Sequence, residues 1–246
     1  MTRFAVLFLA LLAGCGAETE DPFGVLGFTT TACRPGEYRA VGGSQRAWAA
    51  VVRDSARAYR QPGSAELARF GRLNVNQVPT VLGVVGEVVD RSCDARWYRV
   101  RLPIKPNGSI GWVRARDVKL ESVRTRIVVD LSDRRVTLFR DGRPYLRTAA
   151  AIGSPATPTP TGVFYVNQRL VPNYPTGPFG PGAIGISAFS DVLTGWAQGG
   201  PVAIHGTNRP DLIGRAVSNG CIRVRNDMLR RFWRVTFSGT PVIIRA

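Results

Sequence analysis

TRIVVDLSDRRVTLFRDGRPYLRTAAAIG, residues 125–153, contains three runs in which apolar side chains alternate with polar ones. A period of two is typical of strands that bury one face. The runs are separated at Asp133-Arg134 and at Asp141-Gly142, and an Asp-Gly pair strongly favours a tight hairpin. The stretch therefore predicts a three-stranded antiparallel meander.

The chain after this meander mixes strand, loop and helix signals. SPATPTPTGVFYV (154–166) predicts a strand preceded by a proline-rich turn. Residues 167–200 are rich in Gly and Pro without strong periodicity, which is typical of functional lids and binding loops. NDMLRRFWRV (226–235) has apolar residues along one helical face and predicts the one clear helix, with Asn226 as its cap.

The first half of the chain predicts a second β-rich unit. Short β-branched runs are separated by segments rich in Gly, Pro and Asn, and Asn107-Gly108 is a strong hairpin signal. Five short strands at this spacing predict a small barrel. We therefore expect a mainly β protein whose pattern divides near residues 120–123.

The N-terminus predicts export. Residues 1–14 contain one arginine and a short apolar run from Phe4 to Ala13, the pattern of a signal peptide rather than of a transmembrane helix. LAGC resembles the lipobox of bacterial lipoproteins, which implies a lipid on Cys15. Residues 15–35 suit a flexible tether. We expect an exported lipoprotein that Cys15 anchors to a membrane, facing the periplasm or cell wall.

The net charge and its distribution limit the classes of partner that we expect. The chain carries 33 basic and 17 acidic side chains, a net charge of +16, and removal of residues 1–14 leaves +15. Nucleic-acid-binding arms usually concentrate positive charge in blocks, whereas here no run exceeds pairs such as Arg134-Arg135. We therefore expect no nucleic-acid partner, and a basic surface that faces anionic wall polymers or lipid headgroups.

The four cysteines differ in their surroundings. Cys15 is assigned to the lipid, and an oxidising compartment favours a bond between two of the other three. Cys33 and Cys93 flank one domain, whereas Cys221 lies in a chemically unusual turn. We predict a Cys33–Cys93 disulfide and a free Cys221.

HGTNRPDLIGRAVSNGCIRV (205–224) holds the chain's only histidine, His205, and Cys221 sixteen positions later. A cysteine attacks as the thiolate, and an imidazole both lowers its pKa and accepts its proton. Gly220 permits a tight backbone with outward amides, as in an oxyanion hole. Taken singly, such residues are more often structural. The combination predicts thiol catalysis.

HGTN followed by SNGCIRV resembles the signature of L,D-transpeptidases of the YkuD family, in which a histidine precedes a Ser/Thr-x-Gly-Cys-x-Arg motif. The resemblance covers about residues 124–246 and includes IVVDLSDRRVTLFRDG and PTPTG. RLPIKPNGSIGWVRARDV resembles a bacterial SH3-like domain. The implied fold is mainly β: a small SH3-like β-barrel (36–122), then a β-rich L,D-transpeptidase catalytic domain (123–246) with few short helices.

The resemblance makes Cys221 the nucleophile and His205 its base. The backbone carbonyl of Gly206 would fix the imidazole tautomer. Backbone N–H groups of Gly220 and Cys221 would stabilise the oxyanion, with Asn219 a further candidate donor. Many relatives carry a second histidine where Asn219 stands, so His205 has no substitute.

Substrate contacts are implied for residues around this pair. Arg223 would either steer a substrate carboxylate or brace the loop. Ser218 and Asn219 would order the turn and, with Thr207, line the substrate site. No metal or organic cofactor is required.

The implied reaction is acyl transfer between peptidoglycan stem peptides, which serve as donor and acceptor. A thioester on Cys221 would lead to 3→3 cross-links, and water as acceptor would make the protein an L,D-carboxypeptidase. Carbapenem-type β-lactams are expected to acylate the same cysteine. With an ordinary imidazole, activity would fall near about pH 6.5.

Two other interpretations fit parts of the pattern. Papain-like and NlpC/P60 wall peptidases use the same Cys–His chemistry but place the cysteine before the histidine, the reverse of the order here. A non-catalytic lipoprotein that binds the wall through its SH3-like domain would not need an intact pair of His205 and Cys221. The sequence favours the catalytic interpretation.

Overall fold

The computed structural model describes residues 33–193 and 195–246. The expected signal peptide (1–14), Cys15 and most of the expected tether (15–35) lie outside the described residues. Within the described ranges, no helix combines the length and the hydropathy that crossing a bilayer would require.

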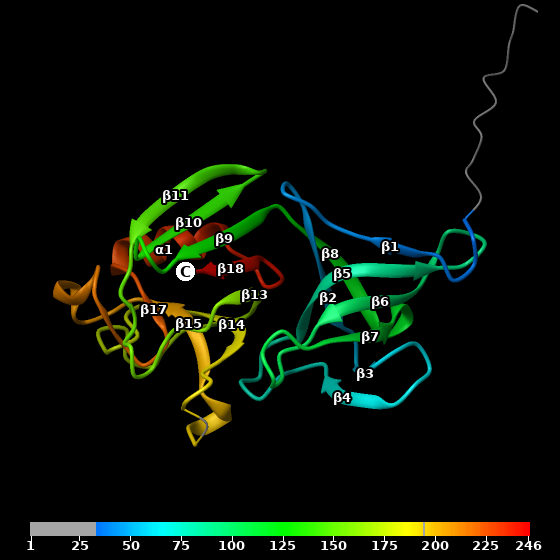
Figure 1. Ribbon diagram of the computed structural model, residues 1–246, viewed down its shortest axis with the longest axis horizontal. Coiled ribbons are helices and arrows are strands. Elements are labelled where there is room, and N and C mark those ends of the chain that lie inside the picture. The colour runs from blue at the N-terminus through cyan, green and yellow to red at the C-terminus, as the bar shows by residue number, and fades with distance from the viewer. Residues whose placement is uncertain (1–32, 194) are drawn as a thin grey trace, which may run out of the picture. The chain divides into compact units, whose positions relative to one another are not determined.

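Two eight-stranded sheets contain most of the strands (Figure 1). The first has the order β4-β3-β7-β6-β5-β2-β8, with β1 paired to β5. Only Arg124 separates its last strand from the first strand of the second sheet. The strands of the first sheet are β1 (Tyr38–Ala40), β2 (Ala47–Val52), β3 (Ser55–Tyr59), β4 (Glu66–Gly71), β5 (Val81–Val89), β6 (Ala95–Arg101), β7 (Ile110–Arg114) and β8 (Val118–Val123).

The expectation of five strands in the first half is wrong, because this sheet has eight. WAAVVRDSARAY forms two strands, since the polar pair Arg53-Asp54 bends the chain between β2 and β3. The strands β1 and β4 are short or polar and lack the β-branched pattern by which strands are recognised. Small and aliphatic side chains from six of the strands form the core of this sheet.

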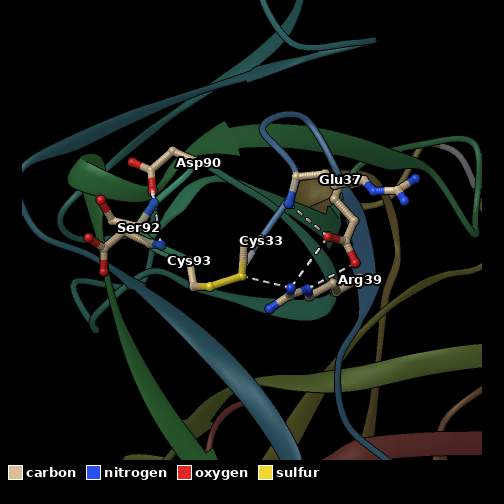
Figure 2. The surroundings of a disulfide bond; sticks show 8 residues. Cys33, Glu37, Arg39, Asp90, Ser92 and Cys93 are labelled. Atoms are coloured by element: carbon tan, nitrogen blue, oxygen red, sulfur yellow. Dashed lines mark hydrogen bonds and ion pairs between the residues drawn. A yellow bond between two sulfur atoms is a disulfide. The ribbon is translucent and has the colours of Figure 1, made fainter. Parts of the chain in front are cut away.

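Figure 2 shows the disulfide that joins Cys33 to Cys93, whose Cα atoms lie 5.2 Å apart. The bond ties the segment before β1 to the turn between β5 and β6, across 60 residues of sequence. Arg39 donates from Nη2 to Cys33 Sγ over 2.8 Å and also pairs with Glu37. The disulfide therefore closes one end of the first sheet.

The second sheet has the order β11-β10-β9-β18-β13-β14-β15-β17. The predicted meander is confirmed, because β9, β10 and β11 pair antiparallel in chain order. Left-handed backbone at Arg134, Asp141 and Gly142 closes its two turns. The strands are β9 (Thr125–Asp130), β10 (Arg135–Arg140), β11 (Arg143–Ala149), β13 (Gly162–Leu170), β14 (Ala183–Phe189), β15 (Pro201–His205), β17 (Ile222–Arg223) and β18 (Pro241–Arg245), while β12 (Ile152–Gly153) pairs separately with β16 (Ala216–Ser218).

The strand β14 is the element that the sequence did not indicate. The expectation of one long loop over residues 167–200 is wrong, because the segment contains the end of β13 and all of β14. Every residue of β14 except Phe189 is buried, so the strand lacks the alternation of a half-exposed strand. Loop segments remain over residues 171–182 and 190–193, and a short 3-10 helix, η2 (Ala197–Gly199), precedes β15.

The helix α1 (Asn226–Val235) has the predicted bounds. Leu229 and Phe232 are buried and join a hydrophobic cluster with Ile and Val side chains of the second sheet. The predicted cap is wrong: Arg225 occupies the N-cap position and makes no side-chain capping bond. The side chain of Asn226 is instead hydrogen-bonded to the loop after β15.

Contacts between the two sheets hold the end of β14. Asn107, from the loop between β6 and β7, donates to the carbonyl of Phe189 (2.7 Å) and accepts from its N–H (2.9 Å). Tyr165 packs so closely on Gly83 that a Cβ there would lie 2.9 Å from its ring. The opposite end of β14 pairs at Ala183 with His205. The first sheet thus supports a strand adjacent to the one that carries His205.

Candidate active site

His205 ends β15 and is 4% exposed. Its Nδ1 lies 2.6 Å from the carbonyl oxygen of Gly206. Because a carbonyl only accepts, Nδ1 must carry the hydrogen, and Nε2 is then the unprotonated nitrogen of the neutral ring. This tautomer leaves Nε2 able to accept a proton.

The surroundings of His205 favour its neutral form. Burial lowers the pKa of the imidazole from 6.5 to about 4. The Gly206 carbonyl opposes this shift, and the positive charge of Arg223 adds to it. His205 is therefore uncharged at neutral pH and remains so well into the acid range.

Cys221 lies immediately before β17, which pairs in parallel with β15. The register sets Ile204 opposite Ile222 and His205 opposite Arg223. Both isoleucines are in the hydrophobic core, so His205 and Arg223 project from the other face. Cys221 precedes β17 and is two residues from Arg223, the residue that pairs with His205.

The thiol of Cys221 is free and partly buried. Burial raises its pKa, while the backbone of Ala203 and the charge of Arg223 act in the opposite direction. The resting cysteine is therefore a neutral thiol.

The backbone around Cys221 forms a tight turn. Ser218 donates from Oγ to the Cys221 carbonyl (2.5 Å), and its Oγ accepts from the Gly220 N–H (3.2 Å). Gly220 has φ of +105°, a conformation that favours glycine. Within the described part of the chain, the N–H groups of Asn219 and Cys221 have no hydrogen-bond acceptor in the protein. Two amides are thus available to an outside acceptor.

Arg223 brings positive charge to both reactive groups. Its side chain is partly buried, and its Nε is buried with no hydrogen-bond partner among the described residues. A buried donor without a partner is costly, so an incoming acceptor would be bound favourably.

Thr207 is buried two residues after His205, and its polar groups form hydrogen bonds within the protein. Its N–H donates to Asn226 Oδ1 (2.8 Å), and its Oγ1 accepts from the Arg209 N–H (2.9 Å). A Cβ on Gly206 would lie 2.3 Å from the same Asn226 oxygen, so only glycine fits. Asn226 therefore fixes the loop that carries the Gly206 carbonyl, a role that its sequence position at a helix start did not reveal.

A family model described as the L,D-transpeptidase catalytic domain YkuD matches residues 124–244. A Bacillus subtilis protein named as L,D-transpeptidase YkuD is 35% identical over 118 residues, covering 48% of this chain and 64% of that protein. A Bacillus licheniformis protein of the same name is 35% identical over 124 residues, covering 50% and 67%. This chain belongs to the YkuD family of L,D-transpeptidases.

A solved structure of the Enterococcus faecium L,D-transpeptidase is similar to part of this chain, with a TM-score of 0.38, 27% identity and coverage of 49% of each chain. The chain spans about two thirds of the length of the two Bacillus relatives and about half of the Enterococcus chain. The first sheet lies almost wholly outside the residues that the family model matches.

Residues 124–244, which the family model matches, contain every candidate catalytic and substrate-binding residue. They lie at the end of β15 and just after it, at the end of β16, in the turn before β17 and on β17: His205, Gly206, Thr207, Ser218, Asn219, Gly220, Cys221 and Arg223. Cys33 and Cys93 lie apart, beside the first sheet. Among the described residues, no group of three His, Cys, Asp or Glu side chains has the arrangement of a metal site.

Proposed function

We propose that the protein is a peptidoglycan L,D-transpeptidase that works through a thioester on Cys221. The observation that supports the proposal is the parallel pairing of β15 with β17, which aligns His205 with Arg223, two residues after Cys221. Membership of the YkuD family supports the class of reaction.

In the first half-reaction, the Cys221 sulfur attacks the carbonyl of the third residue of a donor stem peptide. The thiol proton passes to Nε2 of His205, which the Gly206 carbonyl keeps in the accepting tautomer. The C–N bond to the terminal D-Ala breaks, and the imidazolium returns the proton to the departing amine. The products are a thioester and free D-Ala.

Both reactive groups rest uncharged, because burial raises the thiol pKa and lowers the imidazole pKa. Proton transfer therefore accompanies the attack of sulfur on carbon. The N–H groups of Cys221 and Asn219 stabilise the negative oxygen that develops. Gly220 adds a third donor, because a charged oxygen outcompetes its long bond to Ser218.

In the second half-reaction, an amine of a neighbouring stem peptide attacks the thioester carbonyl. Nε2 of His205 takes a proton from the attacking amine, and the C–S bond breaks as the new amide, the 3→3 cross-link, forms. The imidazolium then returns that proton to the sulfur. Water in place of the amine gives a free carboxylate, which is L,D-carboxypeptidation at the same site.

Arg223 contacts a carboxylate of the stem peptide. Its buried Nε has no hydrogen-bond partner among the described residues, and its charge acts on Cys221. A guanidinium matches a carboxylate in both charge and shape. Ser218 and Thr207 hold the backbone around the substrate, and Asn219 is exposed at its edge.

The rest of the chain exports the catalytic domain, anchors it to a membrane and contacts the cell wall. Residues 1–14 act as a signal peptide, Cys15 carries the lipid, and residues 15–35 tether the protein to a membrane on the periplasmic or wall side. Residues 36–122 form an SH3-like domain that contacts the wall, and residues 123–246 form the catalytic domain. Excess arginine favours anionic wall polymers. A carbapenem acylates Cys221 through its strained carbonyl.

The deciding experiment is intact-mass analysis of the protein after incubation with a disaccharide tetrapeptide, alone and with an added acceptor amine. We expect an adduct that equals the donor minus D-Ala, and an amide product when the amine is present. Cys221→Ala is the matched control, because it removes one sulfur from a partly exposed turn and leaves the fold intact.

Three outcomes of this experiment are informative. An adduct that persists in folded Cys221→Ala would disprove the nucleophile. An adduct resolved only by water would favour the carboxypeptidase. A stem peptide that binds without any mass change would support a wall-binding protein without catalysis.

A further inference from the structure

Thr159 lies under the turn that carries Cys221. It is 5% exposed, and its hydroxyl joins two backbone groups from separate segments. Gly153 N–H donates to Thr159 Oγ1 over 2.8 Å, and Oγ1 donates to the Gly220 carbonyl over 2.9 Å. This single hydroxyl therefore acts as both acceptor and donor.

A second support lies two residues away on the same proline-rich loop. Thr157 donates from Oγ1 to the Ser218 carbonyl (2.9 Å), and the Ser154 N–H donates to the same oxygen (2.9 Å). Residues 154–159 therefore hold the carbonyls of Ser218 and Gly220, one on each side of Asn219. We call this segment the turn support.

The planarity of the peptide bond links these carbonyls to the amides that point away from the loop. In a trans peptide, the C=O of one residue and the N–H of the next point in opposite directions. The carbonyl of Gly220 and the N–H of Cys221 belong to one such unit. A hydroxyl that fixes the carbonyl toward Thr159 therefore aims the Cys221 N–H to the opposite side, where none of the described residues accepts a hydrogen bond from it.

Close packing leaves this arrangement little freedom. A Cβ on Gly153 would lie 2.4 Å from the backbone of Thr157 and Thr159, and a Cβ on Gly220 would lie 3.5 Å from the Pro158 carbonyl. The loop and the turn thus meet backbone to backbone, and the Thr159 hydroxyl is the polar link between them.

We propose that Thr159 is a positioning residue: through the Gly220 carbonyl, it aims the Cys221 N–H at the oxyanion formed when an acyl group is transferred. The inference rests on the proposed function, because the amide has a catalytic task only if Cys221 is acylated. Thr159 acts on the amide donor and leaves the sulfur itself unchanged.

Two reactions of Cys221 distinguish an effect on the amide donor from an effect on the sulfur. Acylation by a carbapenem forms a C–S bond, opens the β-lactam C–N bond and passes through an oxyanion, whereas alkylation by iodoacetamide displaces iodide and forms no oxyanion. Both rates would be measured by intact mass on the full protein at one pH. The variants are Thr159→Val, which keeps the shape without the hydroxyl, and Thr159→Ser, which keeps the hydroxyl.

Thr161→Val is the matched control, because Thr161 is an exposed threonine of the same loop. We expect Thr159→Val to slow acylation about 10- to 100-fold, less than the about 100- to 1000-fold typical of a deleted oxyanion donor. Its alkylation rate should match that of the wild type, which also reports an intact fold. Thr159→Ser should restore most of the acylation rate, and Thr161→Val should change neither rate.

The outcomes separate this inference from the function on which it rests. Thr159→Val with wild-type acylation, or with both rates changed in the same proportion, would overturn the positioning role while leaving the transpeptidase proposal intact. A wild-type protein that is alkylated at Cys221 but accepts no acyl group from either the carbapenem or the tetrapeptide would overturn both.

Discussion

The ring of Phe179 lies against the imidazole of His205, with 4.9 Å between ring centroids and a tilt of 57°. Phe179 belongs to the loop between β13 and β14 and is itself 49% exposed. A half-exposed ring thus covers a buried base. Removal of the Phe179 ring tests how strongly it lowers the pKa of His205.

We expect that in Phe179→Ala the acylation rate begins to fall at a higher pH than in the wild type. The base must be unprotonated, so activity falls as pH drops through the His205 pKa, which burial lowers to about 4. Admitting water should raise that pKa toward its ordinary value of about 6.5. The measurement is the carbapenem acylation rate between pH 3.5 and 8, and Phe179→Leu, which keeps an apolar cover, should behave nearly as wild type. Superimposable profiles for Ala and wild type would contradict the idea.

The folded protein should lose stability in acid because His205 is buried as the neutral ring. Its folded pKa, about 4, lies below the unfolded value, so the unfolded chain binds more protons and stability falls as pH drops from 6.5 through 4. The loss attributable to this residue is about 3 kcal/mol.

Urea unfolding of wild type and His205→Gln at pH 7.5 and 4 would measure this loss. Because Gln does not titrate, the variant should show the shallower fall, and the carboxylates common to both proteins cancel in the comparison. Equal falls for the two proteins would mean that His205 does not carry the effect.

Substitution of Arg223 distinguishes a substrate contact from a structural one. Loss of a charge-assisted bidentate contact typically costs about 1.5–3 kcal/mol, so Arg223→Gln should raise KM for the tetrapeptide about tenfold or more. Arg223→Lys keeps the charge without the planar guanidinium, so its KM should lie between those of the wild type and of Arg223→Gln. A lower melting temperature at unchanged KM would instead assign Arg223 to bracing the loop.

Removal of the Cys33–Cys93 bond should destabilise the protein without touching the chemistry. The chain-entropy model gives about 4 kcal/mol for a loop of this length. Urea unfolding of the double variant Cys33→Ser and Cys93→Ser measures the loss. Acylation of Cys221 at 25 °C should stay at the wild-type rate, because the bond lies beside the other sheet. Slower acylation by folded protein would show that the disulfide end of the first sheet influences the site.

The sequence predicted the elements whose signals are local. The meander over residues 125–149 has clear alternation and an Asp-Gly turn, and the helix at 226–235 has a one-sided apolar pattern. The strand β14 escaped prediction because it is buried on both faces and contains Gly185. Local patterns thus identify half-buried elements better than fully buried ones.

The sequence indicates candidate site residues and does not indicate their protonation states. His205 and Cys221 are recognisable from their spacing, whereas the low pKa of His205 depends on burial by segments such as the one that carries Phe179. An expected loss of activity near pH 6.5 therefore moves to about pH 4. The roles of Thr159 and Asn226 escaped prediction because their hydrogen bonds join segments 61 and 19 residues away.

The raised pKa of the Cys221 thiol also bears on how long the nucleophile survives. Peroxides and disulfide reagents attack thiolates far faster than thiols, so a sulfur that keeps its proton at rest is a poor target for them. In the exported location that we propose, where no glutathione pool repairs damage, a thiol that keeps its proton at rest would be oxidised slowly between turnovers.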